Sequence, residues 1–377
     1  MELTWRGSGG RRASWVSGRQ STRESVKRSP ARPLRCQQRC GRPTEGTRRQ
    51  EATNRRAGAL PWSSPSSSSA SPSSRSDPEP VIPVIASFFV SPLAFNIACL
   101  PLILATSVAF AVKKEVLLSN FLLQGLAGVL VIVWLNLTND VFDSETGADV
   151  EKAESVVNRT GEKEKLFWAA TALLAAGIGI FALVVLQSSQ AIAGAMLLGS
   201  VSIGYIYQGP PFRLSYKGVG EILCFFAFGP LATNAFYLLQ SGTKFAALRG
   251  QGVALGASVL LGLTTSNILL NSHYHQIDTD RRTGKMSPCV RFGTKAVSRA
   301  VVAVVALVYG IYTACLVAGV MPRTTAIVLL SFSSASQLCR FVLENHANKN
   351  VIKPAKFLAV KWHRNFVLLL SLGLFLS

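Results

Sequence analysis

Two groups of acidic and amide side chains follow apolar stretches of this chain, and both could bind a hard metal ion. The first group is Asn136, Asn139, Asp140 and Asp143, and it closes an apolar run that begins at Val116. That run is long enough to cross a bilayer, so the group should lie where a membrane helix emerges into water. On a continuing helix Asp140 and Asp143 share one face. Their oxygens suit Mg²⁺, which completes its shell with waters and substrate phosphates.

The second group follows a later apolar run and contains Asn271, His273, His275, Gln276, Asp278 and Asp280, with Arg281, Arg282 and Lys285 directly after it. Two acidic patches on one side of a membrane can hold a pair of metal ions on a diphosphate, whose remaining charge the cations neutralise. A solvated helix end is the alternative for either patch alone. The two histidines could also bind a metal. Because they are two residues apart, a helix points them to different faces, which favours substrate contacts or plain helix-end positions.

A Gly- and Pro-rich stretch between the two groups, residues 204–221, should break a helix. It presents Arg213 and Lys217 among aromatic residues that include Tyr205 and Tyr207. We interpret it as a phosphate-binding loop whose tyrosines help to shape an apolar cavity, and an ordinary interfacial turn is the alternative. Arg159 is a further candidate cation.

Of the 377 residues, 49% are hydrophobic and only 15% are charged, which excludes an average soluble domain. Charge-free runs mark the candidate membrane helices at 81–112, 116–139, 166–212, 222–243, 250–277, 300–322 and 324–339. The run of 47 residues is too long for one span, and the polar residues 187–190 divide it in two. A last apolar segment, 357–377, contains Lys361 and Arg364. The pattern predicts an all-α membrane protein, a bundle of about nine transmembrane helices.

Lys and Arg outside the first 80 residues are concentrated in every second loop. If the N-terminus and the even-numbered loops share one side, this bias agrees with the positive-inside rule. Both acidic groups and the 207–221 loop then face the cytoplasm or the stroma together.

Residues 1–80 hold 16 of the 39 Lys and Arg residues but only 6 of the 19 acidic ones. They are rich in Arg, Ser and Pro and cannot bury enough apolar surface to offset the entropy of ordering. A basic, Ser-rich segment without an apolar core predicts an organelle transit peptide ahead of a membrane domain over 81–377. A nucleic-acid-binding or merely disordered tail is the alternative. The seven cysteines lack zinc-ligand spacing and are interpreted as small buried hydrophobes.

Several motifs together resemble the UbiA superfamily of intramembrane prenyltransferases over about residues 84–377. They are Asn139-Asp140-x-x-Asp143 with Asp149, the loop from Tyr207-Gln208-Gly209 to Gly218-Val219-Gly220-Glu221, and Asp280-Arg281-x-x-Gly284-Lys285. The loop, the step Phe228-Gly229-Pro230-Leu231 and the run from His273 to Thr294 are similar to the 1,4-dihydroxy-2-naphthoate branch. They look most like its phytyl-transferring form in cyanobacteria and plastids.

The resemblance implies a nine-helix bundle around a central cavity, with Mg²⁺ and phytyl diphosphate at its polar mouth. It implies transfer of the phytyl group to 1,4-dihydroxy-2-naphthoate, with loss of carbon dioxide, towards phylloquinone. The protein would lie in a chloroplast membrane with its active-site loops facing the stroma. The expected partners are these two substrates and the lipid bilayer, and no nucleic acid.

The expected roles follow from the motifs. The expected catalytic residues are Asp140, Asp143 and Asp280, and the expected metal ligands are Asn139, Asp140, Asp143, Asp149, Asp278 and Asp280. The expected diphosphate-binding residues are Arg159, Arg213, Lys217, Arg281 and Lys285. The expected substrate pocket contains Asn136, Tyr205, Tyr207, Asn271, His275 and Gln276.

Two alternatives stay open. Another prenyltransferase of the same superfamily, with homogentisate or a chlorophyllide as acceptor, would share the fold, metals and loops. A membrane transporter with functional carboxylates would place ionisable groups near the bilayer centre. Every acidic residue of the apolar region instead lies in a loop or at a predicted helix end.

Overall fold

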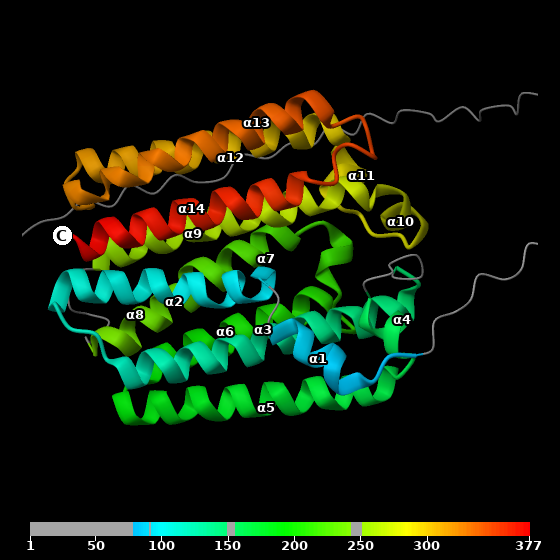
Figure 1. Ribbon diagram of the computed structural model, residues 1–377, viewed down its shortest axis with the longest axis horizontal. Coiled ribbons are helices and arrows are strands. Elements are labelled where there is room, and N and C mark those ends of the chain that lie inside the picture. Colours follow the sequence, from blue (N-terminus) through cyan, green and yellow to red (C-terminus); the bar gives the residue numbers. More distant parts are fainter. Residues whose placement is uncertain (1–77, 90–91, 149–154, 243–250) are drawn as a thin grey trace, which may run out of the picture. The chain divides into compact units, whose positions relative to one another are not determined.

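A computed structural model describes residues 78–89, 92–148, 155–242 and 251–377 of the protein. All of them belong to one compact unit, Ser73–Ser377. These residues form helices joined by turns and loops, and no strand occurs in the described ranges (Figure 1). The predicted transit segment lies outside the described residues except for 78–80, and Asp149 lies outside them as well.

Long helices alternate with short helical segments that lie in the connections between them. In order they are α1 (Val81–Phe89), α2 (Pro92–Lys113), α3 (Leu118–Thr146), α4 (Val156–Thr160), α5 (Lys163–Ser188), α6 (Ala191–Gln208), the 3₁₀ turn η1 (Leu214–Lys217), α7 (Gly220–Phe226), the π-helical η2 (Ala227–Thr233), α8 (Asn234–Ser241), α9 (Gln251–Ser272), the 3₁₀ turn η3 (His273–His275), α10 (Ile277–Arg282), α11 (Pro288–Phe292), α12 (Thr294–Val317), the 3₁₀ segment η4 (Arg323–Ser331), α13 (Phe332–Asn345) and α14 (Ala355–Phe375).

Seven helices within the described ranges are long and apolar enough to cross a membrane. They are α3, α5, α6, α9 and α12, together with the continuous segments Gly220–Ser241 and Arg323–Asn345. α2 adds a shorter apolar stretch, Ile97–Lys113. α14 has 21 residues but includes Lys356, Lys361 and Arg364. The predicted all-α membrane bundle is confirmed, and the number of nine spans stays a prediction.

The helix boundaries show why the polar breaks in the sequence matter. α5 ends at Ser188, Ser189 adopts a left-handed φ of 52°, and α6 begins at Ala191, so the predicted division of the long apolar run is confirmed. The run 81–112 differs from the expectation of one helix, because it is shared between α1 and α2. α2 begins at Pro92, and proline is tolerated in the first turn of a helix but not in its interior.

The long helices pack around α9 and α14. α14 contacts α2, α9 and η4, whereas α3 packs against α5 and α2 (Figure 1). α7 and η2 lie against α9, and α6 lies against η2. A Cβ atom on Gly229 would come within 2.6 Å of the Ser258 carbonyl oxygen on α9, so only glycine allows this approach of the two helices. The close packing fixes the π-helical segment, and π-helical turns are frequent at functional sites.

α14 is anchored by aromatic side chains in the core. Trp362 and Phe366 are both 0% exposed. The Trp362 indole N–H donates a hydrogen bond to the Tyr309 hydroxyl at 3.2 Å, and the Phe366 ring packs edge-on against Tyr309. Packing of these side chains in the core therefore fixes the position of α14, including its first turn.

Candidate active site

The first acidic group lies in the last turns of α3. The 22 residues from Leu118 to Asn139 rise about 33 Å, which is close to the thickness of the hydrocarbon core, so Asp140 comes just beyond it. Asp140 is only 6% exposed, and its Oδ2 accepts a hydrogen bond of 3.0 Å from the backbone N–H of Val156 in α4. The half-buried Asp143 accepts one of 3.0 Å from the Asn139 side-chain amide. The two carboxylates are thus held by different partners.

Tyr216, in η1, joins this group to the loop after α6. Its hydroxyl donates to Asp143 Oδ1 at 3.2 Å and lies 2.6 Å from the Thr146 hydroxyl. Its ring lies beneath Lys285, whose Nζ is 5.6 Å from the ring centroid. Burial, and then the charge of Asp143, raise the pKa of Tyr216 to about 12. The hydroxyl therefore keeps its proton at neutral pH and remains a hydrogen-bond donor to the carboxylate.

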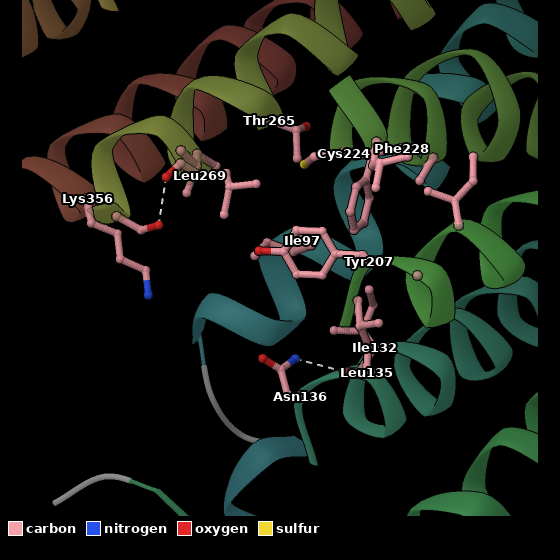
Figure 2. A pocket seen from close by; sticks show the side chains of 16 residues that line it. Ile97, Ile132, Leu135, Asn136, Tyr207, Cys224, Phe228, Thr265, Leu269 and Lys356 are labelled. Carbon is pink, nitrogen blue, oxygen red and sulfur yellow. Dashed lines mark hydrogen bonds between the residues drawn. The ribbon is translucent and has the colours of Figure 1, made fainter. Parts of the chain in front are cut away.

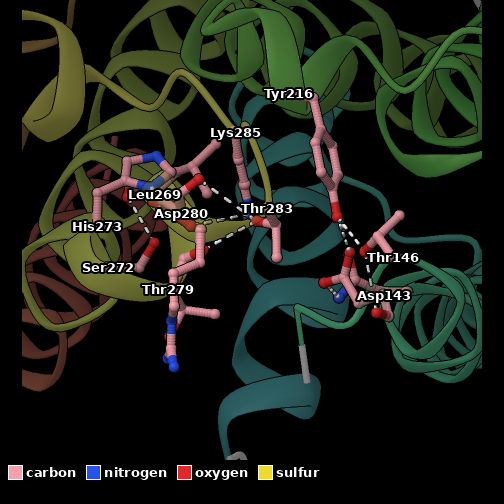
Figure 3. Close-up of polar contacts among 12 residues, drawn as sticks. Asp143, Thr146, Tyr216, Leu269, Ser272, His273, Thr279, Asp280, Thr283 and Lys285 are labelled. Carbon is pink, nitrogen blue, oxygen red and sulfur yellow. Dashed lines mark hydrogen bonds and ion pairs between the residues drawn. The ribbon is translucent and has the colours of Figure 1, made fainter. Parts of the chain in front are cut away.

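The second acidic group is built on η3 and α10, directly after α9. Asp280 is only 3% exposed, and Lys285 Nζ lies 3.9 Å from its Oδ1. His273 Nδ1 lies 4.0 Å from Asp280 Oδ2, while His273 Nε2 lies 2.8 Å from a carboxylate oxygen of Glu221 in α7. Two carboxylates therefore flank one buried imidazole, and Figure 3 shows Asp280 beside His273.

The two groups meet through Tyr216 and Lys285. Tyr216 contacts Asp143 on one side and Lys285 on the other, and Lys285 contacts Asp280 (Figure 3). The connection is fixed by the backbone, since the Met286 N–H donates to the Tyr216 carbonyl at 2.9 Å. Gly218 makes this approach possible, because its φ is +70° and a Cβ atom there would collide with the Met286 carbonyl oxygen.

The carboxylates fit a hard divalent cation. Asp280 Oδ2 is buried and accepts no hydrogen bond within the described structure, and such an oxygen is costly unless a cation or donor meets it. No three Asp, Glu, His or Cys side chains gather into a complete metal site in the described ranges. Few protein ligands per ion suit Mg²⁺, which keeps waters and takes substrate phosphates.

Asp278 lies apart from Asp280, although the two are close in sequence. Its side chain is 60% exposed, and its Oδ2 lies 2.5 Å from Lys349 Nζ. The hydrogen bond from Lys349 lowers the pKa of Asp278. His273 and His275 also diverge, because His273 is buried and His275 is exposed. The metal-binding role of Asp278 stays a prediction.

The predicted diphosphate-binding cations occupy different surroundings. Lys285 contacts Asp280, as described above. Arg213 is paired with Glu145 at 2.7 Å, and Arg159 with Glu79 at 2.6 Å. Lys217, at the end of η1, and Arg281, in α10, are exposed. Their roles toward a diphosphate stay predictions.

An apolar cavity of about 230 Å³ lies within the bundle, close to both acidic groups (Figure 2). Asn136, one turn before Asp140, and Ser272, next to His273, belong to its wall. The other lining residues are Ile97, Ile132, Leu135, Ile203, Gly204, Tyr207, Leu223, Cys224, Ala227, Phe228, Thr265, Ile268, Leu269 and Lys356. A second cavity of about 70 Å³ shares Phe228, Ala227 and Ile132 with it and extends to Phe181 and Phe236.

Two of the predicted pocket residues, Asn136 and Tyr207, line the larger cavity. The other four lie elsewhere. Tyr205 is 38% exposed and donates to the Pro210 carbonyl, whereas Asn271 is buried and donates to the Asn267 carbonyl. His275 is exposed and Gln276 is half-buried. The part of these four residues in substrate binding stays a prediction.

Sequence reasoning did not assign Tyr216, Glu221 or Lys356 to the site. Tyr216 was visible only as one aromatic residue of the loop, and Glu221 only as the end of a motif. Lys356 immediately precedes the last apolar segment, where a cation is normal at a membrane boundary. Nothing in the sequence shows that its side chain reaches the cavity wall.

Comparisons with known proteins agree with this geometry. Residues 98–363 match the model of the UbiA prenyltransferase family. The chain is 39% identical over 285 residues to the 2-carboxy-1,4-naphthoquinone phytyltransferase, chloroplastic, of Arabidopsis thaliana, covering 75% of each chain. It is 36% identical to the 2-carboxy-1,4-naphthoquinone phytyltransferase of Synechocystis, over 75% of this chain and 91% of that one. Its fold is similar to a solved digeranylgeranylglyceryl phosphate synthase, with a TM-score of 0.52, 13% identity and coverage of 79% of this chain and 99% of that chain. The chain therefore belongs to the UbiA prenyltransferase family.

Proposed function

We propose that the protein transfers a phytyl group from phytyl diphosphate to 1,4-dihydroxy-2-naphthoate, a step in phylloquinone synthesis. The observation that carries this proposal is the meeting of two acidic groups, through Tyr216 and Lys285, close to an apolar cavity. This arrangement matches a donor with an anionic head and a long apolar tail. The names of the Arabidopsis and Synechocystis relatives support the phytyl group and the naphthalene acceptor.

The residues at the mouth would bind and orient the diphosphate. Asp140, Asp143 and Asp280 would hold Mg²⁺, which when bound supplies positive charge to the leaving diphosphate oxygens. Lys285 adds a fixed positive charge beside Asp280. Tyr216 keeps the Asp143 carboxylate in place by its hydrogen bond.

The transfer exchanges one carbon–oxygen bond for one carbon–carbon bond. The bond between phytyl C1 and oxygen breaks, and the electron pair leaves with the diphosphate. The ring carbon that carries the carboxylate forms a bond to phytyl C1. The bond from that ring carbon to the carboxylate then breaks, its electrons restore the aromatic ring, and carbon dioxide leaves. No oxidant or extra proton is required.

The cavity wall protects the allylic cation that forms during this exchange. Tyr207 and Phe228 present aromatic rings to the cavity, and the rest of the wall is mainly aliphatic. Aromatic faces stabilise a nearby cation, while an apolar wall excludes the water that would quench it. The phytyl tail is itself lipid-like, so an apolar chamber inside a membrane suits this donor.

An acceptor panel tests the proposal. Full-length protein in lipid nanodiscs would receive Mg²⁺ and labelled phytyl diphosphate with 1,4-dihydroxy-2-naphthoate, homogentisate or a chlorophyllide, and products would be separated by mass. We expect phytylation of the naphthoate and release of carbon dioxide in equal amounts. Transfer to homogentisate or chlorophyllide alone would replace this function with another of the same family. Ion or solute flux in liposomes without any transfer would favour a transporter.

The proposed location is a chloroplast membrane, with the active-site loops facing the stroma. The chloroplast relative from Arabidopsis and the several apolar helices support it. We propose that residues 1–80 act as the transit peptide. Fusion of these residues to a fluorescent protein should direct it into isolated chloroplasts, and a fusion that stays outside would contradict the assignment.

A further inference from the structure

One charged side chain belongs to the wall of the larger cavity. Among the lining residues of the described chain, Lys356 is the only one with a formal charge. It is the second residue of α14, and its side chain is half-buried. Figure 2 shows Lys356 on the α14 side and Asn136 on the α3 side of the space that Tyr207 borders.

The helix dipole does not favour a cation at Lys356, which lies in the first turn of α14. The first turn of a helix disfavours a cation, because the backbone N–H groups there carry partial positive charge. Residues that depart from local preference in this way are often found at functional sites. α14 is held by Trp362 and Phe366 in the core, so the ammonium group is presented from a fixed element.

The proposed function assigns a different cation, Lys285, to the diphosphate of the donor. Lys285 lies beside Asp280 and over Tyr216, at the meeting point of the acidic groups. Lys356 belongs instead to the wall of the apolar chamber, on a helix that carries neither acidic group. A chamber with apolar walls and one cation suits an aromatic acid, whose ring packs on the walls while its carboxylate meets the ammonium group.

We propose that Lys356 binds the carboxylate of the aromatic acceptor and so orients the ring carbon toward phytyl C1. The proposal rests on the proposed function and adds a substrate-binding residue to it. The ion pair holds the ring while the carbon–carbon bond forms, and it ends when the carboxylate leaves as carbon dioxide. Because the pair is made on binding and kept up to bond formation, its loss raises KM for the acceptor more than it lowers kcat.

Steady-state kinetics on the full-length protein test the proposal. Lys356→Met removes the charge and keeps most of the side-chain length, and Lys356→Arg keeps the charge. Lys361→Met is the matched control, because Lys361 lies on the same helix but is exposed and donates to Gln337 at 3.1 Å. We expect KM for the naphthoate to rise about 10- to 100-fold in Lys356→Met, the range for a lost charge-assisted hydrogen bond. KM for phytyl diphosphate should stay unchanged, Lys356→Arg should recover part of the loss, and the control should match wild type.

Equilibrium binding gives a readout that does not depend on turnover. The probes are 1-hydroxy-2-naphthoate and 1-naphthol, which differ only in the carboxylate, and binding is measured calorimetrically in nanodiscs. Wild type should prefer the carboxylated probe, and Lys356→Met should bind both equally. An unchanged preference in Lys356→Met would overturn the proposal, and so would a rise in KM for phytyl diphosphate alone. If wild type does not phytylate the naphthoate at all, the proposed function itself fails, which is a separate outcome.

Discussion

The hydroxyl of Tyr216 offers the sharpest test of how the two acidic groups are connected. It donates to Asp143 at 3.2 Å and contacts the Thr146 hydroxyl, while the ring below Lys285 makes a separate cation–π contact. Tyr216→Phe removes the hydroxyl and leaves the ring in place. Tyr216→Leu removes both interactions. The pair of variants therefore separates the hydrogen bond to the carboxylate from the support of Lys285.

The expected loss of kcat/KM in each variant follows from these contacts. A hydrogen bond to a charged group contributes about 1.5–3 kcal/mol, so Tyr216→Phe should lower kcat/KM for phytyl diphosphate about 10- to 150-fold. Most of this loss should take the form of a higher Mg²⁺ requirement, because Asp143 is then less well oriented. The cation–π contact is largely shielded from water and adds about 0.5–2 kcal/mol, so Tyr216→Leu should lose a further factor of about 2 to 30.

The assay is the initial rate of phytyl transfer in nanodiscs, with Mg²⁺ and phytyl diphosphate varied independently. Tyr312→Phe is the control, because it removes a hydroxyl that is bonded only to Thr325 at 3.2 Å, away from both acidic groups. Thermal unfolding of every variant would show that the fold is retained. A wild-type Mg²⁺ dependence in Tyr216→Phe would refute the reasoning that Tyr216 positions Asp143.

Three further predictions rest on single features of the structure. The pKa of Tyr216 is raised from 10 to about 12, so between these pH values the folded protein holds this proton while the unfolded chain loses it. The free energy of unfolding should therefore fall as pH rises from 10 to 12. Tyr216→Phe should show a smaller fall in thermal midpoint over that range, and an identical fall would contradict the raised pKa. Phe228 lines both cavities, so Phe228→Ala should raise kcat/KM for prenyl donors longer than phytyl relative to phytyl itself, and an unchanged ratio in a donor panel would count against a shared chamber. Gly218→Ala should lower both the thermal midpoint and activity, because φ is +70° and the new Cβ meets the Met286 carbonyl; normal behaviour in both measurements would show that the loop does not need this approach.

Much of the fold could be predicted because charge and polarity mark where helices leave the membrane. The polar break at 187–190 and the acidic end of α3 were both correctly placed. Other features depend on packing and leave no mark in hydropathy. The charge-free run 222–243 reads as one regular helix, yet it contains the π-helical segment around Pro230. The run 324–339 lies in a 3₁₀ segment followed by α13.

The site shows the same division. The chemistry of Asp140, Asp143 and Asp280 could be proposed from residue type and from position at helix ends. Spacing along the chain could not show that Asp278 turns toward Lys349, because that contact joins segments far apart in sequence. The link from Tyr216 to Lys285 and the place of Lys356 in the cavity wall likewise follow from tertiary structure alone.

The central claim is that two acidic groups, distant in sequence, bind one magnesium-bridged diphosphate. Its most direct test is the Mg²⁺-dependent binding of phytyl diphosphate, measured calorimetrically without acceptor, in Asp140→Asn and Asp280→Asn proteins that fold as wild type does. Asp278→Asn, measured beside them, decides whether the second group uses one carboxylate or two. We predict that Asp140→Asn and Asp280→Asn each lose at least about tenfold in affinity at fixed Mg²⁺, as removal of a charged ligand requires. Wild-type affinity in both proteins would contradict the account.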